Sequence, residues 1–192
     1  MKYDAVIFDV DGTLWDSTDV VASAWNCAMD ELGVKRDPIT GDVLKKEFGK
    51  PMNIIVDNLF PMADQDTKDE ILRRACMYEH ELLIDHKESL LFPGVREVFE
   101  TLSKKGKVYV VSNCQCGYIE LFLKKNNLEQ YVTDIECYGN TLLSKGENIK
   151  LVMERNNIQN TFYVGDTMGD FNASKFADIP FVYAKYGFAK VE

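Results

Sequence analysis

The sequence predicts an α/β fold, in which a Rossmann-like, doubly wound parallel sheet carries an inserted α-helical cap. After residue 88, short apolar runs alternate with helical patterns, which is typical of parallel strands joined by right-handed helical crossovers. Between residues 16 and 87 the patterns are helical throughout. We therefore expect residues 1–15 and 88–192 to form an α/β core and residues 16–87 to form a helical cap.

The first strand and the cap helices follow from the spacing of apolar residues. A continuous apolar run from Ala5 to Phe8 precedes a glycine turn, as expected of a buried strand. The first cap helix should begin at Ser17 and end at Gly33, because these residue types favour helix N-caps and C-caps. Further helices are expected over residues 42–48, after Pro51, and over residues 64–85 with the apolar stripe Ile71, Ala75, Tyr78 and Leu82.

The core elements are expected in strict alternation. A Pro-Gly turn at residues 93–94 precedes the first of them, and short β-branched or aromatic runs predict the strands between helices. The predicted helices cover residues 95–104, 118–125, 145–155 and 171–177. The predicted strands cover residues 107–111, 133–137, 161–164 and 180–183.

Bulk composition excludes several classes of protein. The chain has 192 residues, and its net charge of −9 argues against nucleic acid or an anionic membrane as the main partner. No run approaches the roughly 20 apolar residues that a membrane span needs. The five cysteines are odd in number and scattered, which favours reduced thiols and a cytoplasmic protein. A monomer or a homodimer is expected.

Acidic residues follow two of the predicted strands. Asp9 and Asp11 come directly after the first strand, and Asp166 and Asp170 follow the strand that includes Phe162–Val164. The carboxyl ends of parallel strands meet at the edge of the sheet where ligands bind. Two acidic clusters at that edge predict a site for a hard cation, with one carboxylate available for chemistry.

Two further segments are suited to binding an anion. Ser112 and Asn113 lie between a strand and a helix, where a hydroxyl and backbone N–H groups can cradle an anion. Lys145 opens a predicted helix, where its charge opposes the helix dipole, so we expect it to have an acidic or anionic partner.

These motifs, in this order, resemble those of the haloacid dehalogenase superfamily. The resemblance rests on Asp9-x-Asp11-Gly12-Thr13, Ser112, Lys145 and Gly165-Asp166-x-x-x-Asp170, and on the helical cap that follows the first motif. It covers nearly the whole chain. Within the superfamily, the segment Phe8–Ser17 is most similar to phosphoglycolate-phosphatase-like enzymes.

The resemblance implies a role for each motif residue. Asp9 would be the nucleophile that forms an aspartyl-phosphate, and Asp11 the general acid and base, with its backbone carbonyl facing Mg²⁺. Asp166 would complete the protein's ligands to Mg²⁺, and Asp170 would orient a metal-bound water or another ligand. The residues implied in binding the phosphate or the rest of the substrate are Gly12, Ser112, Asn113, Lys145 and, from the cap loop, Lys50.

The function expected from this resemblance is hydrolysis of a small-molecule phosphate monoester. Asp11 separates the chain from the dehalogenases and the phosphonate-cleaving members, which lack a carboxylate at this position. Sugar phosphomutases of the same fold are an alternative. However, they carry a histidine where this chain has Val21, and adjacent acids where it has Asp166 and Thr167. A non-catalytic regulatory module that binds phosphate and metal is a further alternative.

Overall fold

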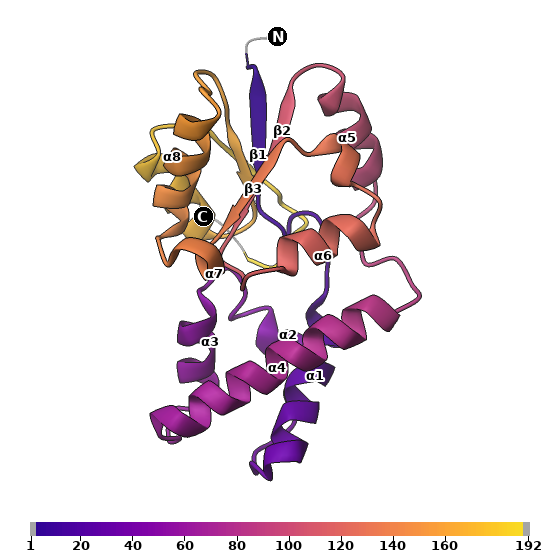
Figure 1. Cartoon of the computed structure of the whole chain (residues 1–192), viewed down its shortest axis with the longest axis vertical. Coiled ribbons are helices and arrows are strands. Elements are labelled where there is room, and N and C mark those ends of the chain that lie inside the picture. Colours follow the sequence, from indigo (N-terminus) through magenta and orange to yellow (C-terminus); the bar gives the residue numbers. More distant parts are fainter. Residues whose placement is uncertain (1–2, 190–192) are drawn as a thin grey trace.

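A computed structural model of the chain describes residues 3–189 and contains one parallel β-sheet (Figure 1). The sheet has five strands in the order β3-β2-β1-β4-β5, and every pair of neighbours is parallel. This confirms the predicted α/β fold with a doubly wound sheet. The strands are β1 Ala5–Phe8, β2 Lys107–Ser112, β3 Asp134–Cys137, β4 Tyr163–Gly165 and β5 Phe181–Tyr183.

Helices cover both faces of the sheet. Alternate residues of each strand point to opposite faces, so apolar side chains lie on both faces and both must be buried. Val6 and Phe8 belong to the core on the face covered by α5 and α6, whereas Ile7 belongs to the core under α8 and α9 (Figure 1). These helices are α5 Val95–Ser103, α6 Tyr118–Lys125, α8 Lys145–Arg155 and α9 Met168–Phe176.

The chain reverses direction across the sheet between β1 and β4. From β1 the chain passes to β2 and β3 on one side, and then crosses to β4 and β5 on the other. Phe8 of β1 is in register with Val164 of β4. Such a switch point opens a crevice at the carboxyl ends of the strands, and Asp9 and Asp166 both lie there.

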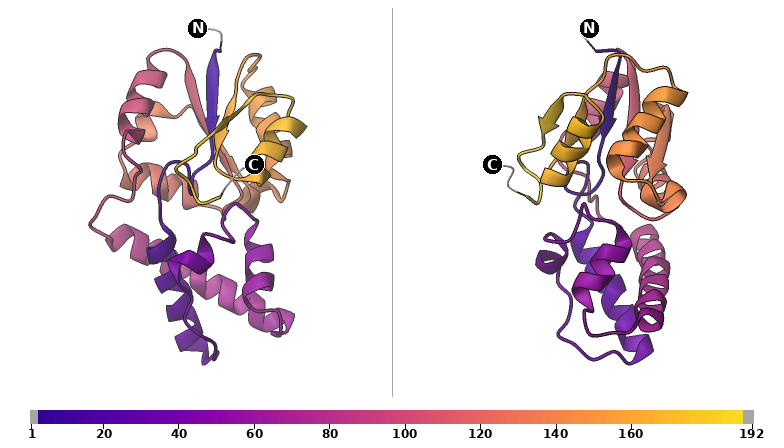
Figure 2. Two further views of the ribbon diagram at one scale, coloured as in Figure 1. Left: turned by 180° about the vertical axis from the view of Figure 1, so that it is seen from behind. Right: turned by 90° about the vertical axis from the view of Figure 1, so that its left-hand side faces the viewer.

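Of the five helices between β1 and β2, the first four form a separate layer beyond the carboxyl ends of the strands (Figure 2). We call these helices and their loops the helical insert; its extent, residues 16–87, remains an interpretation. Trp25 stacks on Phe60 within it, with ring centroids 6.1 Å apart. The helices are α1 Thr18–Leu32, α2 Gly41–Leu44, α3 Met52–Leu59 and α4 Gln65–Asp85.

Several predicted elements differ at their ends. The helix expected over residues 42–48 ends at Leu44 and continues as turns, so the prediction is wrong for its second half. The helix expected from residue 171 begins at Met168, because Thr167 and Asp170 form a capping box before it. The helix α7, Tyr138–Thr141, and a 3-10 turn, Glu129–Tyr131, were not expected, since elements of three or four residues show no period.

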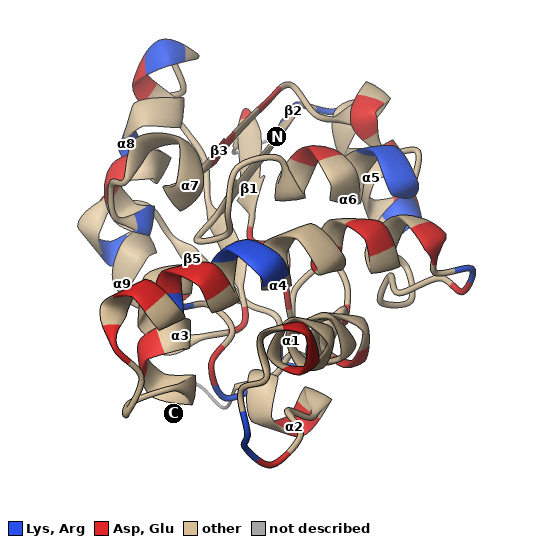
Figure 3. Cartoon of the chain, turned by 60° about the horizontal axis from the view of Figure 1, so that its bottom comes forward, with Lys and Arg blue, Asp and Glu red and all other residues tan. Residues whose placement is uncertain are grey.

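The described residues show where the charged side chains of this acidic chain lie and whether any helix is apolar enough to span a membrane. Acidic residues lie on α1, α3 and α4, and α4 carries basic residues as well (Figure 3). Among residues 3–189, no helix combines the length and the apolar character required to cross a bilayer.

The stacked pair Phe8 and Phe99 provides a test of the core. Their ring centroids are 5.3 Å apart, and Phe99 is fully buried. We expect Phe99→Ala to lower the free energy of unfolding by about 3–5 kcal/mol in urea titrations, because it leaves a cavity under the sheet. Val98→Ala, on the exposed side of the same helix, should change it by less than about 0.5 kcal/mol. Equal effects would contradict this packing.

Candidate functional site

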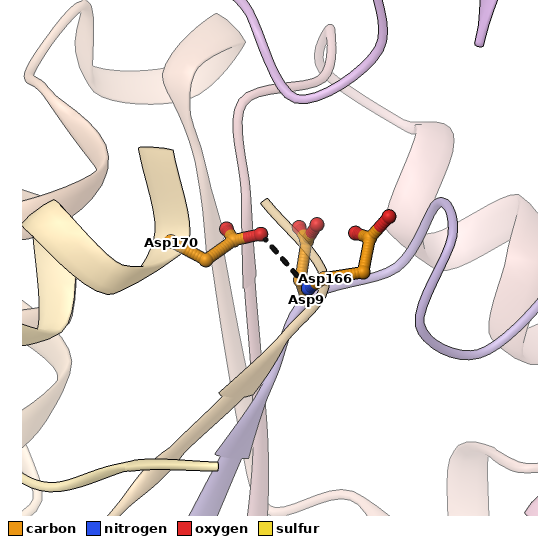
Figure 4. A group of neighbouring side chains, drawn as sticks. All are labelled: Asp9, Asp166 and Asp170. Carbon is orange, nitrogen blue, oxygen red and sulfur yellow. Dashed lines mark hydrogen bonds between the residues drawn. The ribbon is translucent and has the colours of Figure 1, made fainter. Parts of the chain in front are cut away.

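Three carboxylates from separate segments meet at the switch point of the sheet. Asp9 follows β1, Asp166 follows β4, and Asp170 lies in the first turn of α9. One oxygen of each lies within 4.8 Å of the others, and all three side chains are buried. They point to the same side, above the ends of the strands (Figure 4). Asp11 lies outside this group.

Lys145 is the cation that faces the three carboxylates. Its Nζ donates to Oδ1 of Asp9 at 3.0 Å and to Oδ1 of Asp170 at 2.6 Å, and its side chain is buried. Burial alone would lower the pKa of Lys145, but the charges of Asp170 and Asp9 outweigh it and hold this pKa above its ordinary value. This explains how a lysine can open helix α8 against the helix dipole.

The carboxylate of Asp170 is fully engaged within the protein. Oδ1 accepts from Lys145, while Oδ2 accepts from the backbone N–H groups of Asp166 and Thr167 and from the Thr167 hydroxyl. These bonds leave Asp170 suited to holding Lys145 and the loop after β4 in place. They leave it less available as a direct metal ligand than Asp9 or Asp166.

Asp166 retains a free oxygen at the centre of the site. Its Oδ2 accepts from the backbone N–H of Phe188 at 2.7 Å. Its Oδ1 is buried and has no hydrogen-bond partner among the described residues. Burial raises the pKa of Asp166 to about 6. An orphaned, buried carboxylate oxygen next to Asp9 fits a bound divalent cation, which would supply the missing partner.

Asp11 is held by hydrogen bonds on a single oxygen. Its Oδ1 accepts from Trp15 Nε1 at 2.9 Å, Ser17 Oγ at 2.8 Å and Tyr118 OH at 2.8 Å. Burial raises the pKa of Asp11 to about 7, although these donors oppose the shift. A carboxyl group of fixed orientation with a pKa near neutrality can both donate and accept a proton.

The position of Ser17 is as expected, but its side chain has another role. Ser17 precedes α1 at the N-cap position, yet its side chain does not cap the helix. Its hydroxyl instead bonds to Asp11. Gly33 ends the helix in the left-handed conformation, as its residue type predicts.

Gly12 allows the chain to pass close to Asp166. It has a φ of +79°, and a Cβ placed on it would lie 2.3 Å from Oδ2 of Asp166. Gly12 was expected to bind substrate. In the structure, its absent side chain makes room for the Asp166 carboxylate.

A cavity of about 30 Å³ lies between the three-carboxylate site and the helical insert. From the core, Asp9, Asp11, Ser112 and Asn113 line it. From the insert, apolar side chains line most of it, together with Lys50 and Glu79; the apolar residues are Val21, Trp25, Phe48, Met52 and Ile55.

Lys50 and Asn113 lie where the core meets the insert. Asn113 Nδ2 donates to the backbone carbonyl of Gly49 at 2.8 Å, so the loop after β2 is bonded to the insert. Lys50 pairs with Glu47 at 2.8 Å. The structure therefore brings the predicted Lys50 to the cavity, where its charge already has an acidic partner.

Glu79 and Gln115 were not predicted to belong to the site. Gln115 Nε2 donates to Glu79 Oε1 at 2.7 Å, across the gap between the core loop and α4. Burial raises the pKa of Glu79 to about 8, with a further rise from the charge of Asp11. The expected stripe on this helix included Tyr78 and Leu82, but the buried face is Ile71, Ala75, Glu79 and Leu83. The sequence did contain a signal for Glu79, because it is the one acidic residue in a series of apolar residues spaced four apart.

Tyr118 and the segment 186–188 were also missed as parts of the site. Tyr118 is the first residue of α6, and nothing in its local pattern links it to Asp11. Tyr186 donates to the carbonyl of Thr13 at 2.7 Å, and the neighbouring N–H of Phe188 bonds to Asp166. The contacts of Tyr118 and Tyr186 join residues more than a hundred positions apart, and that of Phe188 spans 22 positions. A local sequence pattern cannot show contacts at such separations.

Comparison with known proteins agrees with this geometry. The profile of haloacid dehalogenase-like hydrolases matches residues 6–184. The chain belongs to this family. Membership confirms the resemblance stated from the motifs and the prediction that the protein is an enzyme.

Individual relatives cover almost the whole chain. A phosphoglycolate phosphatase from Nitrosospira multiformis is 29% identical, over 96% of this chain and 84% of its own length. One from Agrobacterium fabrum is 24% identical, over 96% of this chain and 82% of its own length.

Solved structures of low sequence identity share the fold. A predicted phosphatase from Clostridium acetobutylicum superposes with a TM-score of 0.84, at 20% identity, over 99% of this chain and 88% of that one. A haloacid dehalogenase-like hydrolase from Streptococcus pneumoniae superposes with a TM-score of 0.83, at 19% identity, over 98% and 88%.

Gly12→Ala tests the close approach to Asp166. We expect it to weaken divalent-metal binding about tenfold or more in calorimetry, because the new Cβ displaces the Asp166 carboxylate. Gly33→Ala is the matched control: it has a φ of +64°, and its Cβ would meet nothing within 4 Å. In both variants, alanine in the left-handed backbone conformation destabilises the fold by about 1–2 kcal/mol. Equal metal affinity in the two would therefore contradict the proposed crowding of Asp166.

Glu79→Gln tests the buried carboxyl through its effect on stability. Glutamate titrates near pH 4.5 when unfolded and near pH 8 in this protein, so the folded state binds more protons between these values. The stability that the protonated group contributes is complete below pH 4.5 and is lost as the pH rises through about 8. Glu79→Gln should therefore gain stability over the wild type, by the order of a few kcal/mol across this interval, in urea titrations at several pH values. The exposed Glu81→Gln should track the wild type, and parallel curves for both variants would refute the prediction.

Proposed function

We propose that this protein is an Mg²⁺-dependent phosphatase that hydrolyses a small-molecule phosphate monoester through an aspartyl-phosphate on Asp9. The observation that carries the proposal is the pairing of Asp9 with Lys145 beside the unpartnered oxygen of Asp166. A carboxylate can attack a phosphoryl group only where positive charge offsets their repulsion. Lys145 supplies such charge from the chain itself.

Asp9 and Asp166 are the residues that would hold the metal ion directly. Both present carboxylate oxygens, which are the ligands that Mg²⁺ prefers, and Asp166 Oδ1 has no other described partner. When bound, Mg²⁺ would neutralise charge on the phosphoryl oxygens. The backbone carbonyl of Asp11 completes the proposed set, and Asp170 acts by orienting Lys145.

The reaction requires two carboxyl groups with different roles. In the first step, the free oxygen of Asp9 attacks phosphorus in line, and the bond to the leaving oxygen breaks. Asp11 donates its proton to that leaving oxygen and later accepts one from the water that hydrolyses the aspartyl-phosphate. Ser112, Asn113 and Lys145 hold the phosphoryl oxygens.

The substrate is proposed to be small. The cavity of about 30 Å³ has room for roughly two water molecules with the insert in this position. We propose that the core and insert separate to admit a substrate and that closure excludes water during transfer. Lys50 is proposed to contact the substrate near its phosphate. The named relatives support the phosphoglycolate-phosphatase-like branch, and the proposed setting is the cytoplasm.

The structure contains one observation that bears on the phosphomutase alternative. Val21 lines the cavity and is 2% exposed. Phosphomutases resembling this chain use a histidine there, and a valine can neither donate nor accept a proton. This favours hydrolysis over phosphoryl return to a second substrate oxygen.

Asp9→Asn should abolish turnover while the fold is retained. We expect the wild type to release inorganic phosphate from an aryl phosphate only when Mg²⁺ is present, and the variant to fall by about a thousandfold or more in kcat, because an amide oxygen is a poor nucleophile. Circular dichroism checks the fold. The exposed Asp30→Asn is the matched control and should keep full activity. A fall in kcat far smaller than this in Asp9→Asn would refute the nucleophile, and the absence of turnover in the wild type would favour a binding module.

A further inference from the structure

Glu79 is a buried carboxyl group that the proposed reaction does not use. It lies on α4, lines the same cavity as Asp9 and Asp11, and is 3% exposed. Its Oε1 accepts from Gln115, whereas its Oε2 is buried and has no hydrogen-bond partner among residues 3–189. A buried polar atom without a partner is costly, so this oxygen calls for a ligand.

The surroundings of Glu79 make its chemistry unusual. It stands in a row with Ile71, Ala75 and Leu83, which are all fully buried. The cavity wall contributed by the insert is otherwise apolar, apart from Lys50, which pairs with Glu47. An apolar residue at position 79 would continue this row without a desolvation cost. A carboxyl group there is therefore better explained by recognition than by packing.

The protonation of Glu79 limits which substrate group can pair with it. Because its pKa is raised to about 8, both the acid and the carboxylate form are accessible near neutral pH. A substrate carboxylate could pair only with the acid form. A substrate ammonium group could pair only with the ionised form. A hydroxyl group can donate to one form and accept from the other.

We propose that Oε2 of Glu79 binds a hydroxyl group on the organic part of the substrate, so that the site selects hydroxylated phosphate monoesters of low molecular weight. This inference rests on the proposed phosphatase function and adds the chemistry of its substrate. Glu79 acts in substrate recognition, and Gln115 positions it by holding Oε1. Recognition by the insert is thereby linked to the loop that follows β2.

The test is a thermodynamic double cycle, in which the Glu79 side chain and the substrate hydroxyl groups are removed separately and together. Glycerol 3-phosphate and propyl phosphate have the same chain length and differ in their hydroxyl groups. Glu79→Met keeps the length of the side chain and removes its hydrogen bonds. We expect the ratio of kcat/KM for glycerol 3-phosphate over propyl phosphate to fall about tenfold in Glu79→Met, which is the worth of one such hydrogen bond. The exposed Glu81→Met is the matched control and should leave the ratio unchanged.

Other outcomes would overturn the inference. If Glu79→Met lowers turnover of both esters by the same factor, Glu79 has only a structural role. If kcat/KM in the variant falls most for phosphoglycolate, Glu79 recognises a carboxylate instead. If it falls most for phosphoethanolamine, Glu79 recognises an ammonium group. A wild-type preference for propyl phosphate would also contradict the inference.

A binding measurement keeps this inference separate from the proposed reaction. In protein carrying Asp9→Asn, calorimetry with Mg²⁺ gives the dissociation constants of the same two esters without turnover. Addition of Glu79→Met should lower the preference for glycerol 3-phosphate about tenfold there as well. If the wild type releases no phosphate from any ester, the proposed function fails, but the calorimetric ratio still decides the role of Glu79.

Discussion

The site depends on the ion pairing of Lys145 with carboxylates that are buried together. Asp9, Asp166 and Asp170 lie close to one another out of water, where like charges repel and burial raises the pKa of Asp9 and of Asp166. Lys145 touches two of the three and so offsets part of this cost. Two neighbouring features support this arrangement. The capping box of α9 fixes Asp170, and Gly12 leaves space for Asp166.

Asp9 and Asp11 are two residues apart but lie in different surroundings. Asp9 contacts a cation and the other carboxylates, whereas Asp11 contacts three neutral donors from Trp15, Ser17 and Tyr118. Burial raises the pKa of each group to about 7, but this shift is opposed by the positive charge of Lys145 at Asp9 and by hydrogen bonds from neutral donors at Asp11. The turn after β1 therefore places the two carboxyl groups of the proposed reaction in different surroundings by aiming neighbouring side chains in different directions.

The loop after β2 connects the proposed phosphate-binding residues with the helical insert. Ser112 and Asn113 line the cavity, and Asn113 also bonds to the insert at Gly49. Two residues later Gln115 bonds to Glu79 of α4. The proposed closure of the insert and the proposed phosphate site thus share one short segment, so each would stabilise the other without a long chain of contacts.

The sequence by itself determined the order of the strands and of the longer helices, the family, and the two acidic clusters. These are local properties: apolar runs mark buried strands, and in a parallel sheet their carboxyl ends must share one edge, so Asp9 and Asp166 could be placed together in advance. Tertiary structure alone decided the partners. Tyr118 reaches Asp11 across 107 positions and Gln115 reaches Glu79 across 36, distances at which no periodic pattern operates. It also decided that Asp170 holds Lys145, because the choice between metal ligand and lysine partner depends on side-chain directions that the packing of α8 against α9 sets.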